Sequence, residues 1–477
     1  MKKILLFLLI VFALASCKKL AEDPKSIIVQ NQFYKTPNDA ISAVTSVYSS
    51  LNTDPGGDFP MYGRQLYFMA DCATDDETVG NSATNADVRA MGSITYIADN
   101  NRIQANWTQH YRGIDWANVA IDNISTMQFD TVLQNRLIRE SKFIRALLYF
   151  NLVRLFGDVP LVLHQAANVS ATTVSRTASA EVYQQIIADL KAAESLPATY
   201  SGNDIGRATS GAAKTLLAKV YLTQKDWKDA EAKCLEVING PYGYGLFANF
   251  ADVFNKSTKN GKEHIFSVQF LSNSGASNSR DRIMTDVFSG FGSKVPPDLP
   301  ADSSLYKSFA PGDTRKAVTY YTSLLNPATG LQFNFKYIGL RKFIDTTQYL
   351  TSIEDGINFP VLRYADVLLM YAEAVNEDIG PTTDAYNAIN QVRERAKVPD
   401  ITPGLSQSDF RNAVYQERRF EFVEEGQRWF DLARTGRVVS AISTVAAKSA
   451  VSTKNNLFPI PQAEINVNPA VTQNPGW

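Results

Sequence analysis

The sequence predicts a mainly helical protein, built on about four pairs of helices, with a second lobe rich in loops and short β-strands. Three observations favour this fold class. Apolar residues recur at three- and four-residue steps over long segments, and small residues recur where paired helices would cross. Glycine, serine, asparagine and proline accumulate between residues 241 and 359. With 477 residues, of which 45% are hydrophobic and 20% charged, the chain is long enough for a large globular core.

The first half of the chain supplies three of the predicted helical pairs. They are 37–51 with 104–127, 131–156 with 180–196, and 209–223 with 226–239. The first helix has a clear start, because Thr36 suits the N-cap and Pro37 suits the first helical position. The third pair, with Ala218 and Ala230 among its small residues, looks like a tetratricopeptide unit. Between the first two helices, residues 52–104 are predicted to be mostly loop.

The fourth pair lies near the C-terminus, at 360–377 with 381–397. The spacing between pairs is irregular, which predicts a right-angled tetratricopeptide-like scaffold rather than a continuous solenoid. Short β-like runs occur at 264–271 and 319–324, with a weaker one at 333–338. These patterns predict a helical domain at 18–240, a loop-rich lobe at 241–359, and a C-terminal domain at 360–477 that completes the scaffold.

The amino terminus carries the pattern of an export signal. Lys2 and Lys3 precede an apolar run, residues 4–14, that is too short to span a bilayer comfortably. The following Leu-Ala-Ser-Cys resembles a bacterial lipoprotein cleavage box, which would make Cys17 the lipidated first residue of the mature protein. An ordinary signal peptide that happens to contain a cysteine is the alternative. We therefore expect residues 1–17 to be a lipoprotein signal peptide.

The two other cysteines are Cys72 and Cys234. An exported compartment permits a disulfide between them. Cys234, however, lies on the apolar side of a predicted helix, which favours burial, and no bridge is predicted.

Charge and motifs exclude several function classes. The formal net charge is −1, so no basic field exists to attract nucleic acid. No nucleophile elbow, zinc-protease motif, phosphate loop or dinucleotide fingerprint is present, and the three histidines, His110, His164 and His264, are far apart. No cofactor and no metal are predicted. The acidic run 71–77 has oxygens that suit Ca²⁺ but lacks EF-hand spacing, so a solvated loop is favoured.

The segment 417–434 packs acids, arginines and aromatics together densely. Its apolar spacing predicts an amphipathic helix up to Val423, with Gly426 as a stop. Glu417 and Glu421 then lie on or beside the apolar stripe, where a charge must be paired. The nearby candidates for that pairing are Arg418, Arg428 and Arg434.

Glu-Arg-Arg-x-Glu-Phe, followed by Glu-Gly-x-Arg-Trp-Phe-Asp-Leu-x-Arg, resembles the C-terminal motif of the SusD/RagB family. Members of that family are outer-membrane lipoproteins of Bacteroidetes-type bacteria that capture nutrients. The turn at 156–160 and the tail 457–477 also resemble this family. The residues that carry the signature are Glu417, Arg418, Glu421, Gly426, Arg428, Trp429, Asp431 and Arg434.

A structural role for the signature is favoured over a catalytic one. The alternative is a carboxylate pair formed by Glu417 with Glu421 or Glu424. The surrounding arginines would keep both acids ionised, whereas a general acid needs a raised pKa.

A glycan binder needs aromatic rings flanked by amide and guanidinium donors, because sugars present apolar faces and hydroxyl groups. Loops 52–104 and 272–310 offer this mixture, and they resemble in position the regions from which the family builds its binding face. The candidate ligand-binding residues are Tyr62, Arg64 and Tyr67; Arg89, Tyr96, Asn100 and Asn101; and Phe288, Phe291 and Tyr306 near Arg280 and Arg282. Trp107 is a further candidate, although helix packing explains it equally well.

The resemblance implies a non-catalytic lipoprotein of the cell outer membrane, lipid-anchored and exposed at the surface. Such a protein captures oligosaccharide and delivers it to a SusC-type TonB-dependent channel. A peptide-binding RagB-like lipoprotein with the same partner is one alternative. An all-helical glycoside hydrolase with two acids is the other.

Overall fold

The protein is mainly helical in a computed structural model that describes residues 33–80, 83–168, 172–272, 298–326, 330–345 and 356–477. The predicted lipidation site Cys17, together with Phe288, Phe291, Arg280 and Arg282, lies outside these residues. The longer helices are α2 (Pro37–Ser49), α3 (Ala86–Ser93), α4 (Asn101–Thr126), α5 (Thr131–Phe156), α6 (Ser179–Ala193), α7 (Ser210–Gln224), α8 (Trp227–Ile238), α12 (Tyr364–Ile379), α13 (Thr383–Arg395) and α14 (Gln407–Glu421).

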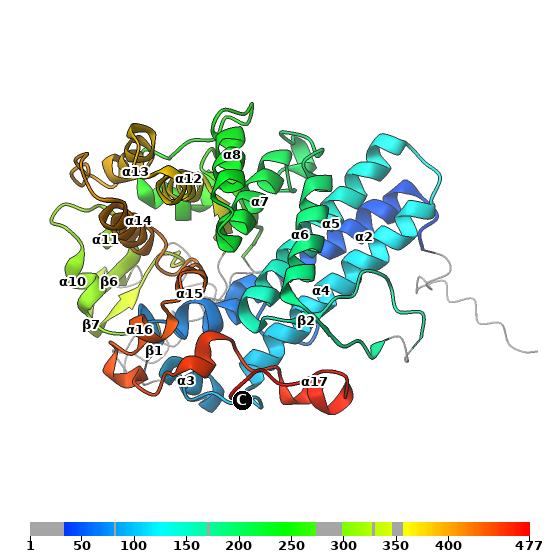
Figure 1. The fold of residues 1–477 in the computed structure, drawn as a ribbon, viewed down its shortest axis with the longest axis horizontal. Coiled ribbons are helices and arrows are strands. Elements are labelled where there is room, and N and C mark those ends of the chain that lie inside the picture. Colours follow the sequence, from blue (N-terminus) through cyan, green and yellow to red (C-terminus); the bar gives the residue numbers. More distant parts are fainter. Residues whose placement is uncertain (1–32, 81–82, 169–171, 273–297, 327–329, 346–355) are drawn as a thin grey trace, which may run out of the picture.

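Shorter helices connect and cover this frame. They are η2 (Met61–Gln65), η3 (Phe68–Cys72), η5 (Gly202–Asp204), η6 (Phe250–Phe254), η7 (Lys256–Thr258), α10 (Ser304–Ser308), α11 (Arg315–Thr319), α15 (Arg428–Arg434), α16 (Val438–Ile442), η9 (Ala446–Lys448), η10 (Thr453–Asn456) and α17 (Gln462–Val467). Figure 1 shows the helices running from α2, α4 and α5 through α6, α7 and α8 to α12, α13 and α14, with α3, α16 and α17 along the lower edge.

The predicted helical pairs are all in contact. Helix α2 packs on α4, α5 on α6, α7 on α8, and α12 on α13. Successive pairs also touch, since α6 packs on α7 and α8 on α12. The start of α2 forms as expected: the Thr36 hydroxyl accepts the Asp39 N–H, and Pro37 occupies the first turn. The tetratricopeptide-like character of these pairs and the domain boundaries stay predictions.

The strands are few and pair in twos. The antiparallel pairs are β1 (Glu77–Val79) with β5 (Asp298–Pro300), β2 (Val159–Pro160) with β3 (Arg176–Thr177), β4 (His264–Val268) with β8 (Phe359–Arg363), and β6 (Tyr320–Asn326) with β7 (Leu331–Leu340). Strands β4, β6 and β7 form where β-like runs were expected.

Residues 52–104 contain more regular structure than the predicted loop. They form η2, η3, β1 and α3, because apolar side chains such as Met61, Phe68 and Met69 are buried in the core and hold the backbone in place. Glycine pairs and acidic residues interrupt the apolar spacing in this segment, so the spacing did not predict these elements.

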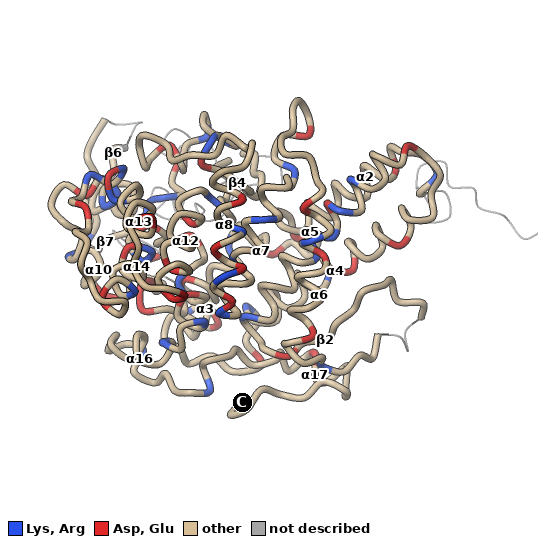
Figure 2. Tube along the Cα trace, turned by 45° about the horizontal axis from the view of Figure 1, so that its top comes forward, with Lys and Arg blue, Asp and Glu red and all other residues tan. Residues whose placement is uncertain are grey.

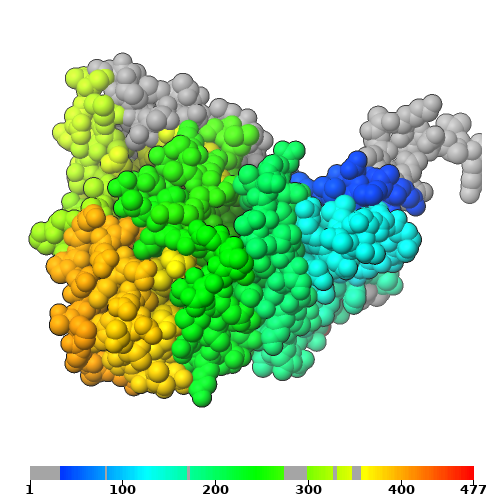
Figure 3. Space-filling view, turned by 90° about the horizontal axis from the view of Figure 1, so that it is seen from above, coloured from blue at the N-terminus to red at the C-terminus, as the bar shows by residue number. Residues whose placement is uncertain are grey.

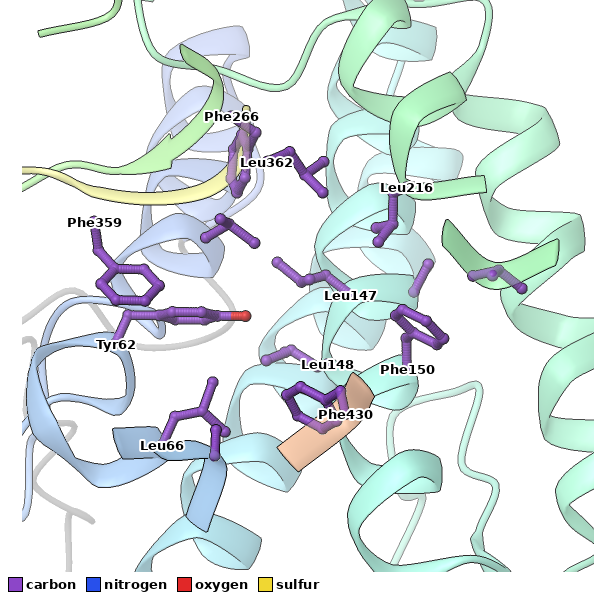
Figure 4. Packing of buried hydrophobic residues seen from close by; sticks show 14 of the residues in the cluster. Tyr62, Leu66, Leu147, Leu148, Phe150, Leu216, Phe266, Phe359, Leu362 and Phe430 are labelled. Carbon is purple, nitrogen blue, oxygen red and sulfur yellow. The ribbon is translucent and has the colours of Figure 1, made fainter. Parts of the chain in front are cut away.

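One cluster of buried hydrophobic residues runs from Ala40 to Val471. Figure 4 shows how distant segments meet in it: Tyr62 and Leu66 lie near Leu147 and Leu148 of α5, beside residues of β8 and α15. The N-terminal helices and the C-terminal segment therefore share a core.

Candidate functional site

The structure brings two of the predicted binding regions together. Strand β1 pairs with β5, with Thr78 opposite Leu299. Close by, the Arg64 guanidinium forms an ion pair with Asp298 at 3.2 Å, and the Ala301 N–H donates to the Asp76 carbonyl. Helix α3 contacts β1 and α4. We call the surface formed by β1, β5, α3 and the first turn of α4 the loop junction.

Two of the predicted ligand-binding residues are exposed at the loop junction. Arg89 lies on α3 and donates to the Ala83 and Thr84 carbonyls. Asn101 begins α4, and its amide donates to the Asp87 carboxylate at 2.9 Å. The junction therefore presents a guanidinium, an amide and a carboxylate within two adjoining helical turns, which is the polar mixture that sugar hydroxyls need.

Three other candidates are buried, so the expectation of an exposed platform is wrong for them. Tyr62, Tyr67 and Tyr96 are each only 2% exposed. The Tyr62 hydroxyl accepts from the Asn151 amide at 2.9 Å, and burial raises the pKa of Tyr62 to about 12. Each ring gains more by filling the apolar core than by meeting water.

Tyr96 illustrates the reason. Its ring stacks on Phe458 and on Trp477, with centroids 5.1 and 5.4 Å away. Two rings of the C-terminal segment therefore stack on the Tyr96 ring. No local sequence pattern could reveal these contacts.

Arg64 and Asn100 also have structural partners. The Arg64 guanidinium lies 5.5–5.7 Å from the ring centroids of Phe59, Tyr67 and Phe68. The Asn100 side chain is buried and caps α4 by accepting the Arg102 N–H at 2.9 Å.

Trp107 is one of the residues that line a separate hollow of about 320 Å³. Its ring packs against Tyr111 and Phe156, with centroids 4.9 and 5.1 Å away, and its N–H donates to Glu464 at 3.2 Å. Only 4% of Trp107 is exposed. Helix packing therefore accounts for most of its surface.

Tyr306, on α10, is half-buried. Its ring meets the edge of Tyr320, and the Lys316 ammonium lies 4.1 Å from its centroid. The Lys316 ammonium therefore lies over a face of the Tyr306 ring on which a sugar would otherwise stack.

The signature acids lie in a buried ion-pair network. Glu421 accepts from Arg363 at 2.6 Å and from Arg315 at 3.1 Å, and it also pairs with Arg395. Burial alone would raise the pKa of Glu421, but these three guanidinium groups hold it well below its usual range. Glu421 therefore stays ionised and is unsuited to donate a proton.

These partners correct the sequence prediction. Glu417 pairs with Arg315 at 2.6 Å and with Arg393, rather than with the arginines next to it in sequence. Helix α14 also ends at Glu421, before Gly426. Arg315, Arg363 and Arg395 come from other segments of the chain. The sequence indicated only that a buried acid needs a compensating positive charge, and not which arginines supply it. Figure 2 shows acidic and basic positions interleaved around α12, α13 and α14.

Arg418, Arg428 and Arg434 bind other acids. Arg418 pairs with Asp366 at 2.7 Å and with Asp431 at 2.9 Å. Arg434 also pairs with Asp431, at 2.9 Å. The Trp429 ring is fully buried against Phe458. The signature thus joins α12, α14, α15 and the C-terminal segment.

The acidic run 71–77 is buried rather than solvated. Asp75 receives a two-point contact from Arg428, at 2.7 and 2.9 Å, and Asp76 pairs with Arg419 at 2.6 Å. The Gly426 N–H donates to the Asp71 carboxylate. The run was predicted to be a solvated loop because its arginine partners lie more than 300 residues away in sequence.

A lysine ammonium satisfies the carbonyls of this run. Lys448 donates to the carbonyls of Cys72, Thr74 and Glu77 at 2.5–2.6 Å. Burial lowers the pKa of Lys448 to about 8. In the described part of the chain, no group of three or more His, Cys, Asp or Glu is arranged to hold a metal ion. Cys72 and Cys234 are both buried free thiols.

Most of the chain is similar in sequence to known protein families. Residues 290–477 match the model of the SusD family, and residues 42–222 match a family described as starch-binding and associating with the outer membrane. A SusD-like protein P2 of Formosa agariphila is 28% identical over 99% of both chains.

The fold is also similar to solved structures over most of the chain. A SusD superfamily protein of Parabacteroides distasonis is 28% identical, with a TM-score of 0.81, and the match covers 92% of this chain and 99% of that one. A laminarin binding SusD-like protein is 27% identical, with a TM-score of 0.78, and the match covers 93% of this chain and 100% of that one. Within the described residues, no helix is long and apolar enough to span a bilayer.

Proposed function

The chain belongs to the SusD/RagB family, and from that premise we propose that it is a non-catalytic binding protein for oligosaccharides at the outer membrane. It captures the glycan at the cell surface and passes it to a SusC-type TonB-dependent channel. The lipid on Cys17 anchors it beside that channel.

The loop junction carries this proposal. It joins two chain segments, 52–104 and 298–306, that are far apart in sequence. Arg89, Asn101 and Asp87 lie on its surface and offer donors and an acceptor to hydroxyl groups. Because the Asn100 side chain donates to the Asp87 carbonyl and accepts the Arg102 N–H, it links α3 to the start of α4 and positions these polar groups before a ligand arrives.

The signature acids support a binding role rather than hydrolysis. A hydrolase needs one carboxyl group with a raised pKa and another that stays ionised. Glu421 and Asp431 are instead held ionised by arginines, and both pKa values are lowered. Glu421 and Asp431 are therefore unsuited to be the proton donor that the glycoside hydrolase alternative needs.

A glucan is the first ligand to test. The family model that matches residues 42–222 is described as starch-binding, and a structural neighbour at 27% identity is described as laminarin binding. A peptide remains the alternative cargo, because the loop-junction polar groups would also serve peptide amides.

The binding experiment uses the processed chain, residues 18–477, in affinity gels that contain laminarin, starch or a casein digest. We expect slower migration with a glucan and no released sugar. The double variant Arg89→Ala with Asn101→Ala should lose at least about 1 kcal/mol of binding, the usual loss when a ligand's hydrogen-bonding partners are removed. Lys228→Ala is the matched control, because Lys228 is exposed on α8, which lies across the molecule from α3 (Figure 1).

Each outcome of this experiment discriminates between the alternatives. Retardation by the casein digest alone would favour a peptide cargo. Free sugar released by purified protein would contradict the non-catalytic assignment.

The anchor has its own test. Cys17→Ala removes the sulfur that carries the lipid and should move the protein from the membrane fraction to the soluble fraction. Unchanged membrane attachment would refute the lipid anchor.

A further inference from the structure

The hollow of about 320 Å³ beside Trp107 has no part in the proposed function, and we call it the α4 hollow. Its walls come from one face of α4, the segment that follows β2, and α17. Figures 1 and 2 both place α17 beside β2. The α4 hollow shares no residue with the loop junction, so it is a separate candidate site.

Hydrogen bonds tie the walls of the α4 hollow together. The Tyr111 hydroxyl and the Asn118 amide donate to backbone carbonyls of the segment 160–162, at 2.8 and 2.9 Å. From the same helix, the Trp107 N–H donates to the Glu464 carboxylate of α17 at 3.2 Å. The hollow is therefore built into the fold, and these donors are already used within its walls.

Asp115 is an acid of this wall that a ligand can reach. It lies on α4 between Tyr111 and Asn118, at spacings of four and three residues, so the three side chains leave one face of the helix. Asp115 lines the hollow and is exposed. The surrounding walls partly desolvate its carboxyl group, which raises the pKa of Asp115, and no neighbouring cation lowers it. Its carboxylate therefore has no ion-pair partner among the described residues.

The lining carries a second acid and no base. Glu464 forms no ion pair among the described residues, and its printed partner is the neutral Trp107 N–H. No lysine, arginine or histidine is among the described residues that line the hollow. Arg176, on β3, donates to the carbonyls of Asp158 and Thr472 instead. Two acids in a concave wall produce a negative potential that attracts a cation.

The rest of the wall is largely apolar. Ile114, Val162 and Val174 line it together with the ring of Tyr111. Such a wall suits an organic cation better than a metal ion, which takes several oxygen ligands. Its volume is at the lower end of the range of about 300–1,000 Å³ that is usual for small-molecule sites.

We infer that the α4 hollow binds a primary ammonium group on a short aliphatic stem, as in a free alkylamine or a lysine side chain. The ammonium donates to the Asp115 carboxylate, and the stem lies along Tyr111 and the aliphatic wall. Glu464 adds to the negative potential. The inference does not rest on the proposed function, because it uses no residue of the loop junction.

Saturation-transfer NMR tests this inference on the processed chain, with n-pentylamine and Nα-acetyl-lysine methylamide as probes. Both are protonated at about pH 7, and 1-pentanol is the neutral counterpart. We expect transfer to the amines and none to the alcohol. Asp115→Asn should weaken amine binding by at least about tenfold, which corresponds to about 1.4 kcal/mol. Asp115→Glu keeps the charge and should weaken it less than about threefold.

Asp229→Asn is the matched control, because Asp229 is an exposed acid on α8. Helix α8 belongs to the green segment on the face that Figure 3 shows from above, whereas α17 lies along the lower edge of Figure 1. The control should bind the amines like the unchanged chain. Asp115→Asn should keep the melting temperature of the unchanged chain, because Asp115 has no ion pair to lose among the described residues.

The two amine probes distinguish the source of the ammonium. Tighter binding of the lysine derivative would support a peptide, and tighter binding of n-pentylamine would support a free amine. No transfer to either amine, equal binding of 1-pentanol, or the same amine affinity in Asp115→Asn as in the unchanged chain would overturn the inference.

The affinity gels separate this inference from the proposed function. Retardation by a glucan together with no amine binding would sink the amine site alone. Amine binding that depends on Asp115, without retardation by any glucan, would support the amine site and contradict the proposed function.

Discussion

Glu421 lies at the centre of a buried cluster of guanidinium groups, so its charge serves the fold. We expect Glu421→Gln to keep the side-chain shape and to leave Arg315, Arg363 and Arg395 undercompensated. Breaking a buried ion pair in this way costs about 3–5 kcal/mol. Urea unfolding should report that loss. The control Glu394→Gln, an exposed acid on α13, should change the free energy of unfolding little, and an equal effect of both variants would contradict this account.

The same residues predict how stability depends on acid. The pKa values of Glu421 and Asp431 are lowered from 4.5 and 3.8, so the unfolded state takes up their protons first as the pH falls. Their stabilisation is present in full above those unfolded values and is lost as the pH falls through and below them. Free energies of unfolding at about pH 6 and about pH 3 should therefore differ, with less stability in acid. The difference should be smaller in Glu421→Gln, and stability that rises in acid would contradict the prediction.

At the scale of elements, the acidic run is fixed to the C-terminal signature by paired side chains. The Arg428 guanidinium holds the Asp75 carboxylate at two points, and this links the run to α15. A double-mutant cycle with Arg428→Ala and Asp75→Ala should give a coupling free energy of about 0.5–3 kcal/mol, as is usual for residues in one ion-pair network. Additive effects of the two substitutions would show that the contact does not join the elements.

The elements also show what a sequence can predict. Helices α2, α5, α7, α8 and α13 follow from local periodicity and start or stop residues, and they form where expected. The helix expected at 360–377 begins later, as α12 at Tyr364, because residues 360–363 belong to β8, which pairs with β4. The ladder between β1 and β5 and the burial of Tyr96 under Phe458 and Trp477 depend on contacts across hundreds of residues. Local patterns carry no information on such contacts, so the buried tyrosines looked like a binding platform.

At the scale of the whole molecule, one hydrophobic cluster links α2 with the C-terminal tail. We expect the chain to unfold in a single cooperative transition, with tryptophan fluorescence and far-ultraviolet circular dichroism giving the same midpoint. Two separated transitions would show instead that the predicted segments 18–240, 241–359 and 360–477 are stable on their own.

The whole arrangement is a helical frame that displays polar groups on its loop junction. Buried arginines and acids, for which the sequence favoured a structural role, hold the frame together. Arg89 and Asn101 lie exposed at the junction, and they are the residues that we expect to meet cargo.

Calorimetry of the processed chain with laminarin oligosaccharides, followed by chromatography of the ligand, separates binding from hydrolysis. We expect saturable binding, recovery of intact oligosaccharide, and at least about fivefold weaker binding for Arg89→Ala with Asn101→Ala, which corresponds to about 1 kcal/mol. Shortened products, or the same affinity in the double variant as in the unchanged chain, would contradict it.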